Sequence, residues 1–232
     1  MAANKQTRKE LLNEPDEFLT FSDHAVKWVK ENTRAVAIGA GVVVVAVVVL
    51  VSILGYMKSQ REAASLALAE AFPAYAQAMA AEDAKALAEG LSAMKKVADE
   101  YGSFSAGKQA RLAVGSLSML AKKYAEAGKS FKSLTEESGV PKSIKALAWR
   151  GLGQSQEAGG DLKAAAASYQ SALTEAGPNL ADIVKMDRAR VLAASGGKAE
   201  AEKIYRAMLA SRGNAILAAQ AKNSLVALGL RP

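Results

Sequence analysis

The side chains able to do acid–base or metal chemistry are sparse in this sequence. His24 is its one histidine, lies near the N-terminus, and is accompanied by no cysteine. A histidine-based triad in the main domain, a multi-histidine metal site and a thiolate nucleophile are therefore excluded. Two pairs of adjacent carboxylates, Glu82-Asp83 and Glu136-Glu137, fall near expected helix ends. Neighbouring positions on a helix point in different directions, so we interpret both pairs as solvated helix ends.

Phosphate binding and nucleic-acid binding also lack a signal. The glycines of Gly151-Leu152-Gly153 fall inside a helical repeat, where close helix packing explains them. The net charge of +7 lies wholly beyond residue 57, where lysines and arginines are scattered among glutamates and aspartates without a basic run. We therefore expect no enzymatic activity, no cofactor or metal site, no small-molecule substrate and no nucleic-acid partner.

Composition and one apolar run indicate an all-α membrane protein. Half of the 232 residues are hydrophobic while only 6% are aromatic, a balance typical of closely packed, alanine-rich helices. Residues 35–57 carry no charge and include an almost unbroken valine run. That length spans the ~30 Å hydrocarbon layer as a helix, and it exceeds both a typical strand and a signal-peptide core. We predict one transmembrane helix over 35–57, an uncleaved signal anchor flanked by Trp28 and Tyr56.

The flanking charges predict the orientation of this helix. Cations precede it at Lys5, Arg8, Lys9, Lys27, Lys30 and Arg34, whereas Lys58 and Arg61 follow it. Because cytoplasmic flanks carry the excess of basic residues, we expect residues 1–34 to be a cytoplasmic tail and residues 58–232 to lie across the membrane. In the tail we predict disorder to about Pro15 and then a short amphipathic helix over 23–32, capped by Ser22. That helix either lies in the membrane interface or docks on a partner.

A repeat organises residues 58–232. One unit has the spacing of a tetratricopeptide repeat, carried by Trp149, Leu152, Gly153, Gly160, Ala165, Tyr169, Ala172 and Pro178. Shifting back 38 residues aligns Gly115, Ala127 and Phe131, and shifting forward 36 aligns Ala189, Gly196, Ala201 and Tyr205. In such a unit two antiparallel helices approach where the small residues meet, and the aromatic residue fills the space beside the next unit. We therefore predict a tetratricopeptide-like helical-hairpin solenoid.

The two ends of the predicted solenoid are less regular. A poorer first unit pairs a helix that runs from the membrane to about Ala80, kinked at Pro73, with a helix from Asp83 to Tyr101. At the other end Asn214 begins, and Gly229 ends, a single capping helix. The first helix of each unit should line a concave groove suited to peptides or protein surfaces. Its predicted protein-binding residues are Gln109, Ser116, Met119, Arg150, Gln154, Glu157, Met186 and Arg190.

The whole arrangement resembles a known family. A short charged tail, the lead-in Trp28-Val29-Lys30-Glu31-Asn32, one span and a divergent repeat domain are similar to the bacterial ancillary SecYEG translocon subunit family. The resemblance implies a bacterial inner-membrane protein whose periplasmic domain assists exported proteins, beside translocon subunits and with a membrane-anchored periplasmic chaperone. It carries over no catalytic residue. The same fold also suits a tethered scaffold for cell division, secretion or outer-membrane construction, or an accessory subunit of an enzyme.

Overall fold

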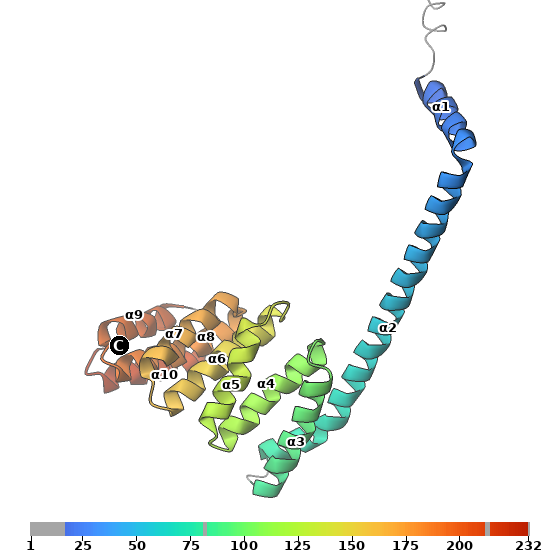
Figure 1. The fold of residues 1–232 in the computed structure, drawn as a ribbon. Helices are drawn as coiled ribbons and strands as arrows, with labels where there is room; N and C mark the ends of the chain where they lie inside the picture. The colour runs from blue at the N-terminus through green and yellow to red at the C-terminus, as the bar shows by residue number, and fades with distance from the viewer. Residues whose placement is uncertain (1–16, 81–82, 212–213, 232) are drawn as a thin grey trace, which may run out of the picture. The chain divides into compact units, whose positions relative to one another are not determined.

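The structure is a computed structural model that describes residues 17–80, 83–211 and 214–231, and Figure 1 shows its fold. Ten helices and no strands make up the described part of the chain, as the all-α prediction requires. Internal contacts divide the chain into two compact units, Met1–Ser59 and Gln60–Pro232. The second unit contains the helices that form a buried core.

The first helix, α1 (Glu17–Glu31), begins earlier than we predicted. Ser22 lies inside α1, so its predicted role as a cap is wrong. The sequence explains the earlier start, because Phe18 and Phe21 continue the helical spacing of Ala25 and Trp28 by a further two turns. The predicted disorder up to about Pro15 lies outside the described residues.

The second helix, α2 (Thr33–Ala80), is 48 residues long and contains the whole predicted span. Among the residues that the structure describes, it is the one helix long and apolar enough to cross a membrane. Its valines and leucines from Val42 to Leu54 are exposed to the surroundings of the protein. The helix then continues without interruption through Pro73, where we expected a kink, and ends at Ala80 as predicted.

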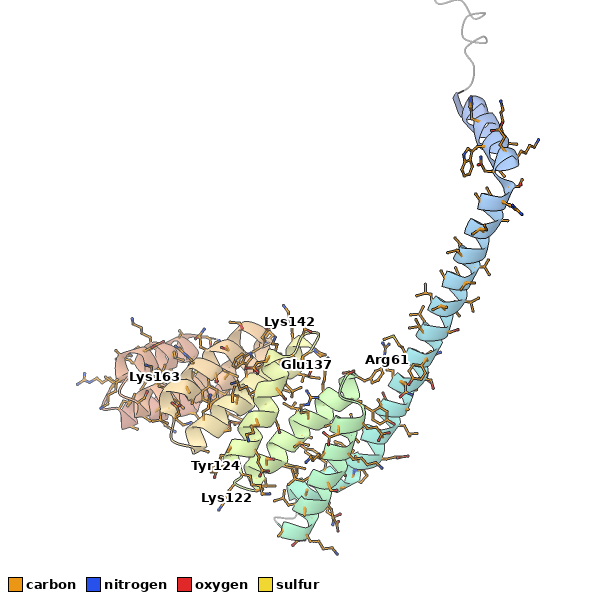
Figure 2. All side chains as sticks on the ribbon, viewed as in Figure 1. Arg61, Lys122, Tyr124, Glu137, Lys142 and Lys163 are labelled. Carbon is orange, nitrogen blue, oxygen red and sulfur yellow. The ribbon has the colours of Figure 1, made fainter. Side chains whose placement is uncertain are left out.

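The other helices follow one another in chain order across the second unit, from green α3 to red α10 in Figure 1. They are α3 (Ala84–Glu100), α4 (Ser105–Leu120), α5 (Tyr124–Glu136), α6 (Lys142–Ala158), α7 (Leu162–Glu175), α8 (Pro178–Ala194), α9 (Lys198–Ala210) and α10 (Ala215–Ala227). From α3 onward each helix packs against the next, and α4 also contacts α6 as α8 contacts α10. Figure 2 shows Tyr124 and Glu137 at opposite ends of α5, with Lys142 at the same end as Glu137. Consecutive helices therefore run back and forth.

Side-chain caps begin the first and last helices of the segment α3 to α10, and the cap predicted at Asn214 is confirmed. The backbone N–H of Ala86 donates to Oδ2 of Asp83 (3.1 Å), which begins α3. The N–H groups of Ile216 and Leu217 donate to Oδ1 of Asn214 at 2.9 and 3.3 Å, which begins α10. Beyond α10, Gly229 has a positive φ of 77°, a left-handed conformation that glycine adopts at low cost.

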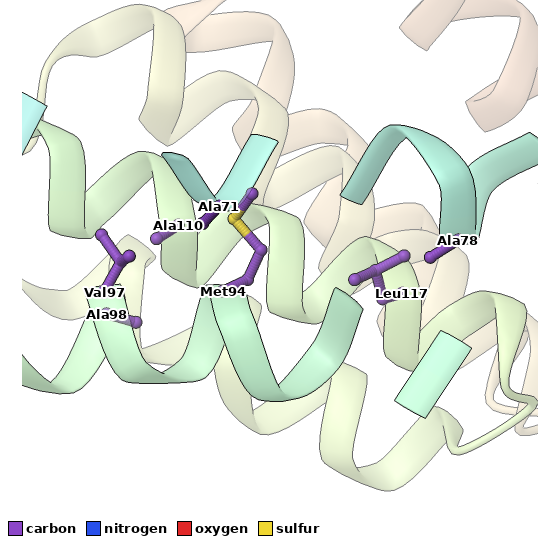
Figure 3. Packing of buried hydrophobic residues seen from close by; sticks show 7 residues of the cluster. All are labelled: Ala71, Ala78, Met94, Val97, Ala98, Ala110 and Leu117. Atoms are coloured by element: carbon purple, nitrogen blue, oxygen red, sulfur yellow. The ribbon is translucent and has the colours of Figure 1, made fainter. Parts of the chain in front are cut away.

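The first pair of helices, α2 with α3, which we predicted to be a poorer repeat unit, has a core of its own. Figure 3 shows that core, which joins α2, α3 and α4 through Ala71, Ala78, Met94, Val97, Ala98, Ala110 and Leu117. Leu87 and Leu91 of α3 pack against this cluster beside Met94. Alanine contacts of this kind let helices approach closely, which explains why the pair is well packed despite few large side chains.

The close contacts among α4, α5, α6 and α7 each place an aromatic ring against a glycine. A Cβ atom added at Gly115 would lie 2.5 Å from the Phe131 ring, and one added at Gly151 would lie 2.6 Å from it. Phe131 therefore fits between α4 and α6 with glycine on both sides. Gly153 faces the ring of Tyr169 in the same way, at 2.7 Å. At each of these positions the absence of a side chain on the glycine makes room for an aromatic ring.

Three turns repeat the same backbone conformation at the predicted spacing. Lys122, Gly160 and Gly196 have φ values of 58°, 87° and 94°, and they lie 38 and 36 residues apart. The residue after each one donates its N–H five residues back, over 2.8 to 2.9 Å. The three bonds are Lys123 to Ser118, Asp161 to Gln156 and Gly197 to Leu192. This arrangement closes the C-terminus of α4, α6 and α8 alike.

Lys122→Gly is therefore expected to stabilise the helical domain by about 1 kcal/mol, because a side chain in the left-handed region is strained there. The free energy of unfolding of the full chain in detergent, followed by circular dichroism, measures the effect. Lys123→Gly is the matched control, since φ at Lys123 is −87° and glycine there only adds chain entropy to the unfolded state. Equal destabilisation by both substitutions would contradict the turn conformation.

Candidate protein-binding groove

An open groove of about 460 Å³ lies between α2, α4 and α6. We call it the apolar groove, and its large side chains are Leu68, Phe72, Tyr75, Leu112, Ile144 and Leu147. Its polar lining consists of the serine hydroxyls of Ser105, Ser116 and Ser143 and the amide of Gln109. None of its 13 lining residues is charged, although 23% of the whole chain is. The groove can thus accept an uncharged segment without desolvating any ion of its own.

The apolar groove exists because α2 carries two apolar stripes. Ala64, Ala71 and Ala78 recur every seven residues and are buried inside the domain. Leu68, Phe72 and Tyr75 follow a neighbouring stripe with helical spacing that faces the groove. Phe72 remains 57% exposed, and Leu147 across the groove is 40% exposed. Large apolar side chains that stay this accessible indicate a binding surface, because a partner that covers them lowers the free energy of the complex.

The structure separates the eight residues that we predicted to bind protein. Gln109 and Ser116 line the apolar groove. Met119 instead packs against the cluster around Phe131, and Met186 packs against the cluster that joins α8, α9 and α10. Gln154 is half-buried on α6. The sequence pattern did not identify Phe72, Tyr75 and Leu147, which the two stripes of α2 and the exposed leucine of α6 could have revealed.

The remaining three predicted residues belong to an ion-pair network that joins α6 to α8. Nε of Arg150 donates to Oδ2 of Asp187 at 2.7 Å. The guanidinium group of Arg190 forms an ion pair with Glu157 and reaches Oδ1 of Asp187 at 3.3 Å. Both arginines are thus held by carboxylates of their own chain. Charge reversal of Arg150 and Arg190 would break these ion pairs, so a loss of binding in such a variant could not be separated from a loss of stability.

Tyr169 adds a third helix to this network. Its hydroxyl donates to Oε2 of Glu157 at 2.9 Å, and its ring is buried against Gly153. Burial raises the pKa of the Tyr169 phenol well above its ordinary value, the Asp187 carboxylate raises it further, and Arg150 partly offsets these effects. The phenol therefore stays protonated and keeps donating at any pH below about 10. The network fixes α6, α7 and α8 relative to one another.

One of the two carboxylate pairs is also structural. We interpreted Glu136-Glu137 as solvated, and this is wrong for Glu137, which accepts from Arg111 (2.6 Å) and lies 3.3 Å from the ammonium of Lys108. Lys108 is nearly buried and also donates to the backbone oxygen of Gly139 at 3.2 Å. The three side chains fasten α4 to the end of α5. In the other pair Asp83 is the α3 cap, and Glu82 lies outside the described residues.

Comparisons of this chain with protein-family models, with curated proteins and with solved structures found no match. The apolar groove and the ion-pair network are therefore the features from which a function can be inferred. The network holds its charges within the chain, whereas the groove leaves apolar surface open.

Proposed function

We propose that this chain is a membrane-anchored protein-interaction module that binds apolar segments of exported polypeptides. The observation that carries the proposal is the apolar groove, whose lining holds no charge and leaves Phe72 57% and Leu147 40% exposed. An incompletely folded polypeptide exposes leucine, valine and phenylalanine side chains that a folded protein buries. Covering such side chains and those of the groove together gains about 25 cal/mol per Å² of apolar surface.

The proposal includes a tetratricopeptide-like solenoid capped by α10. Supporting it are the recurrence of one turn conformation at Lys122, Gly160 and Gly196 and the packing of each helix on the next. In a solenoid each unit buries its apolar face only against its neighbours, so a concave surface remains open for partners. The apolar groove, which α2, α4 and α6 form, would lie on that surface.

The place of action rests on the resemblance to the ancillary SecYEG translocon subunit family. It implies that α2 anchors the chain in a bacterial inner membrane and that the domain works in the periplasm beside translocon subunits and a membrane-anchored chaperone. Leu68 lies only 11 positions after Met57 along the chain. Even a fully extended chain of that length reaches no more than ~40 Å, so Leu68 cannot lie farther than that from the end of the proposed span. A polypeptide leaving a translocon would then have the groove within reach.

We expect residues 1–34 to be cytoplasmic and the domain beyond residue 57 to be periplasmic, because six cations precede the apolar run. Protease added to intact spheroplasts should then digest the domain and spare the tail. A tag at each terminus, followed by immunoblotting, reports which side is cut. A protected domain with a cleaved tail would reverse the orientation and remove the periplasmic role.

Peptide binding to the full chain in neutral nanodiscs tests the proposed function directly. A fluorescent, uncharged peptide rich in leucine and phenylalanine should bind with an affinity that changes little with salt, because no ion pair forms. A peptide of the same length that replaces these residues with serine and asparagine should not bind. Equal binding of both peptides, or of neither, would refute the groove as a site for apolar segments.

A further inference from the structure

A second groove, of about 780 Å³, lies between α3, α4 and α5, and its chemistry is opposite to that of the apolar groove. We call it the lysine groove. Its base includes Leu91 of α3 and Val114 of α4, and its rim includes Lys95 of α3 and Lys129 of α5. Four cations line it against two carboxylates, Asp99 and Glu126. We propose that the lysine groove binds an acidic segment of a partner polypeptide.

The rim cations of the lysine groove are available to such a partner. Lys95 and Lys129 are both exposed, and neither has a carboxylate within 4.0 Å in the described part of the chain. Arg111, the third cation, is already held by Glu137 at 2.6 Å. The fourth, Lys123, makes only a long contact with Glu126 at 3.9 Å. An ammonium group without an anionic partner attracts a carboxylate from outside the chain, and two of them across one groove fix its path.

Hydroxyl groups complete the recognition surface. Ser118 lines the groove from α4 but is only 2% exposed, so it lies beneath the surface that a ligand would meet. Ser92 on α3 and Ser130 on α5 also line it. Such hydroxyls can donate to carboxylate oxygens or to the backbone carbonyls of an extended chain. Leu91 and Val114 beneath them can cover an apolar side chain, so the expected ligand alternates acidic and apolar residues.

A groove lined by α7, α8 and α9 also contains cations, and two of its three are paired within the chain. Lys185 bonds to Asp182 at 2.9 Å, and Arg188 forms an ion pair with Glu200. Its third cation, Lys203, is exposed like Lys95 and Lys129 but does not face a second unpaired cation across the groove. A lipid surface is also a poor fit for the lysine groove, because headgroups present a broad plane whereas these cations border a recess with an apolar base. Charge and shape together favour a polypeptide.

Titration of peptides against the full chain in neutral nanodiscs tests the proposal. The probe is a short fluorescent peptide of alternating glutamate, leucine and serine, and its control replaces each glutamate with glutamine. The acidic peptide should bind more tightly, and its affinity should fall as salt rises. Lys95→Glu with Lys129→Glu should weaken its binding about tenfold. The uncharged leucine–phenylalanine peptide of the apolar groove should be unaffected, so failure of one groove does not imply failure of the other.

Lys163→Glu with Lys222→Glu is the matched control, since both lysines are exposed and have no ion-pair partner in the described residues. Lys163 is labelled in Figure 2. Equal affinity for the glutamate and glutamine peptides, or equal loss in the two double variants, would overturn the proposal. So would protection of Lys95 and Lys129 from an amine reagent by phosphatidylglycerol nanodiscs, which would indicate lipid. If the chain self-associates and only the Lys95→Glu, Lys129→Glu variant loses this self-association, the occupant of the groove is a second copy of the chain, which would also overturn the proposal.

Discussion

Gly115→Ala is expected to destabilise the helical domain by about 3 kcal/mol, because the new methyl group would overlap a ring that cannot move away. The Cβ atom would lie 2.5 Å from Cε1 of Phe131. On its other side the same ring is 2.6 Å from the Cβ position of Gly151. Alanine favours a helix by about 1 kcal/mol over glycine, so a net loss would show that the overlap outweighs helix propensity. Chemical unfolding of the full chain in detergent measures the change.

A double-mutant cycle makes this result specific to the ring. In a Phe131→Leu background the smaller side chain leaves room, and Gly115→Ala should then cost less than about 1 kcal/mol. The same cost in both backgrounds would mean that Gly115 and Phe131 do not meet as described. The cycle tests the packing between α4, α5 and α6 and is independent of any function.

The second large effect concerns the apolar groove. Phe72→Glu and Leu147→Glu each place a carboxylate where we propose that an apolar segment binds, and each should weaken the uncharged peptide's affinity about tenfold to a hundredfold. Phe72 is 57% and Leu147 40% exposed in the free chain, so the new carboxylate of each variant can reach solvent. Fluorescence anisotropy in nanodiscs measures the affinity, and circular dichroism checks that the fold persists.

Val226→Glu is the matched control for these groove variants. Val226 is a similarly exposed apolar residue, but it lies on α10, away from the apolar groove. Its substitution should leave peptide affinity unchanged. If all three variants weaken binding equally, the peptide binds exposed apolar surface in general, and the groove has no particular role.

The helices were largely predictable because their signals are local. An asparagine before α10 and a glycine after it each act within one turn, and both predictions are confirmed. The long uncharged run lies within a single helix, α2, that is long and apolar enough to cross a membrane. The spacing of Gly115 and Gly153 also indicated two positions at which neighbouring helices come into close contact. The sequence did not reveal that the small residue meets an aromatic ring, because that depends on how far the paired helices rotate about their axes.

The residues of the candidate groove were harder to predict for a physical reason. Polar side chains on the first helices were expected to point into the groove, yet Arg150, Glu157 and Arg190 found partners within the chain. Ion pairs between residues more than 30 positions apart cannot be recognised from spacing along one helix. Conversely, Phe72 and Tyr75 are large apolar residues of the kind that usually forms a core. Only the burial of Ala71 and Ala78 shows that another face of α2 forms the core here.

Site-specific photocrosslinking in intact membranes tests the central claim most directly. A photoreactive amino acid at position 147 reports contacts of the apolar groove, and the same amino acid at positions 28 and 41 reports contacts of the tail and the span. We predict adducts between position 147 and newly exported polypeptides, and we expect Phe72→Glu to reduce them strongly. Adducts that arise only from positions 28 and 41, with none from the groove, would contradict the proposal that this domain binds exported polypeptides.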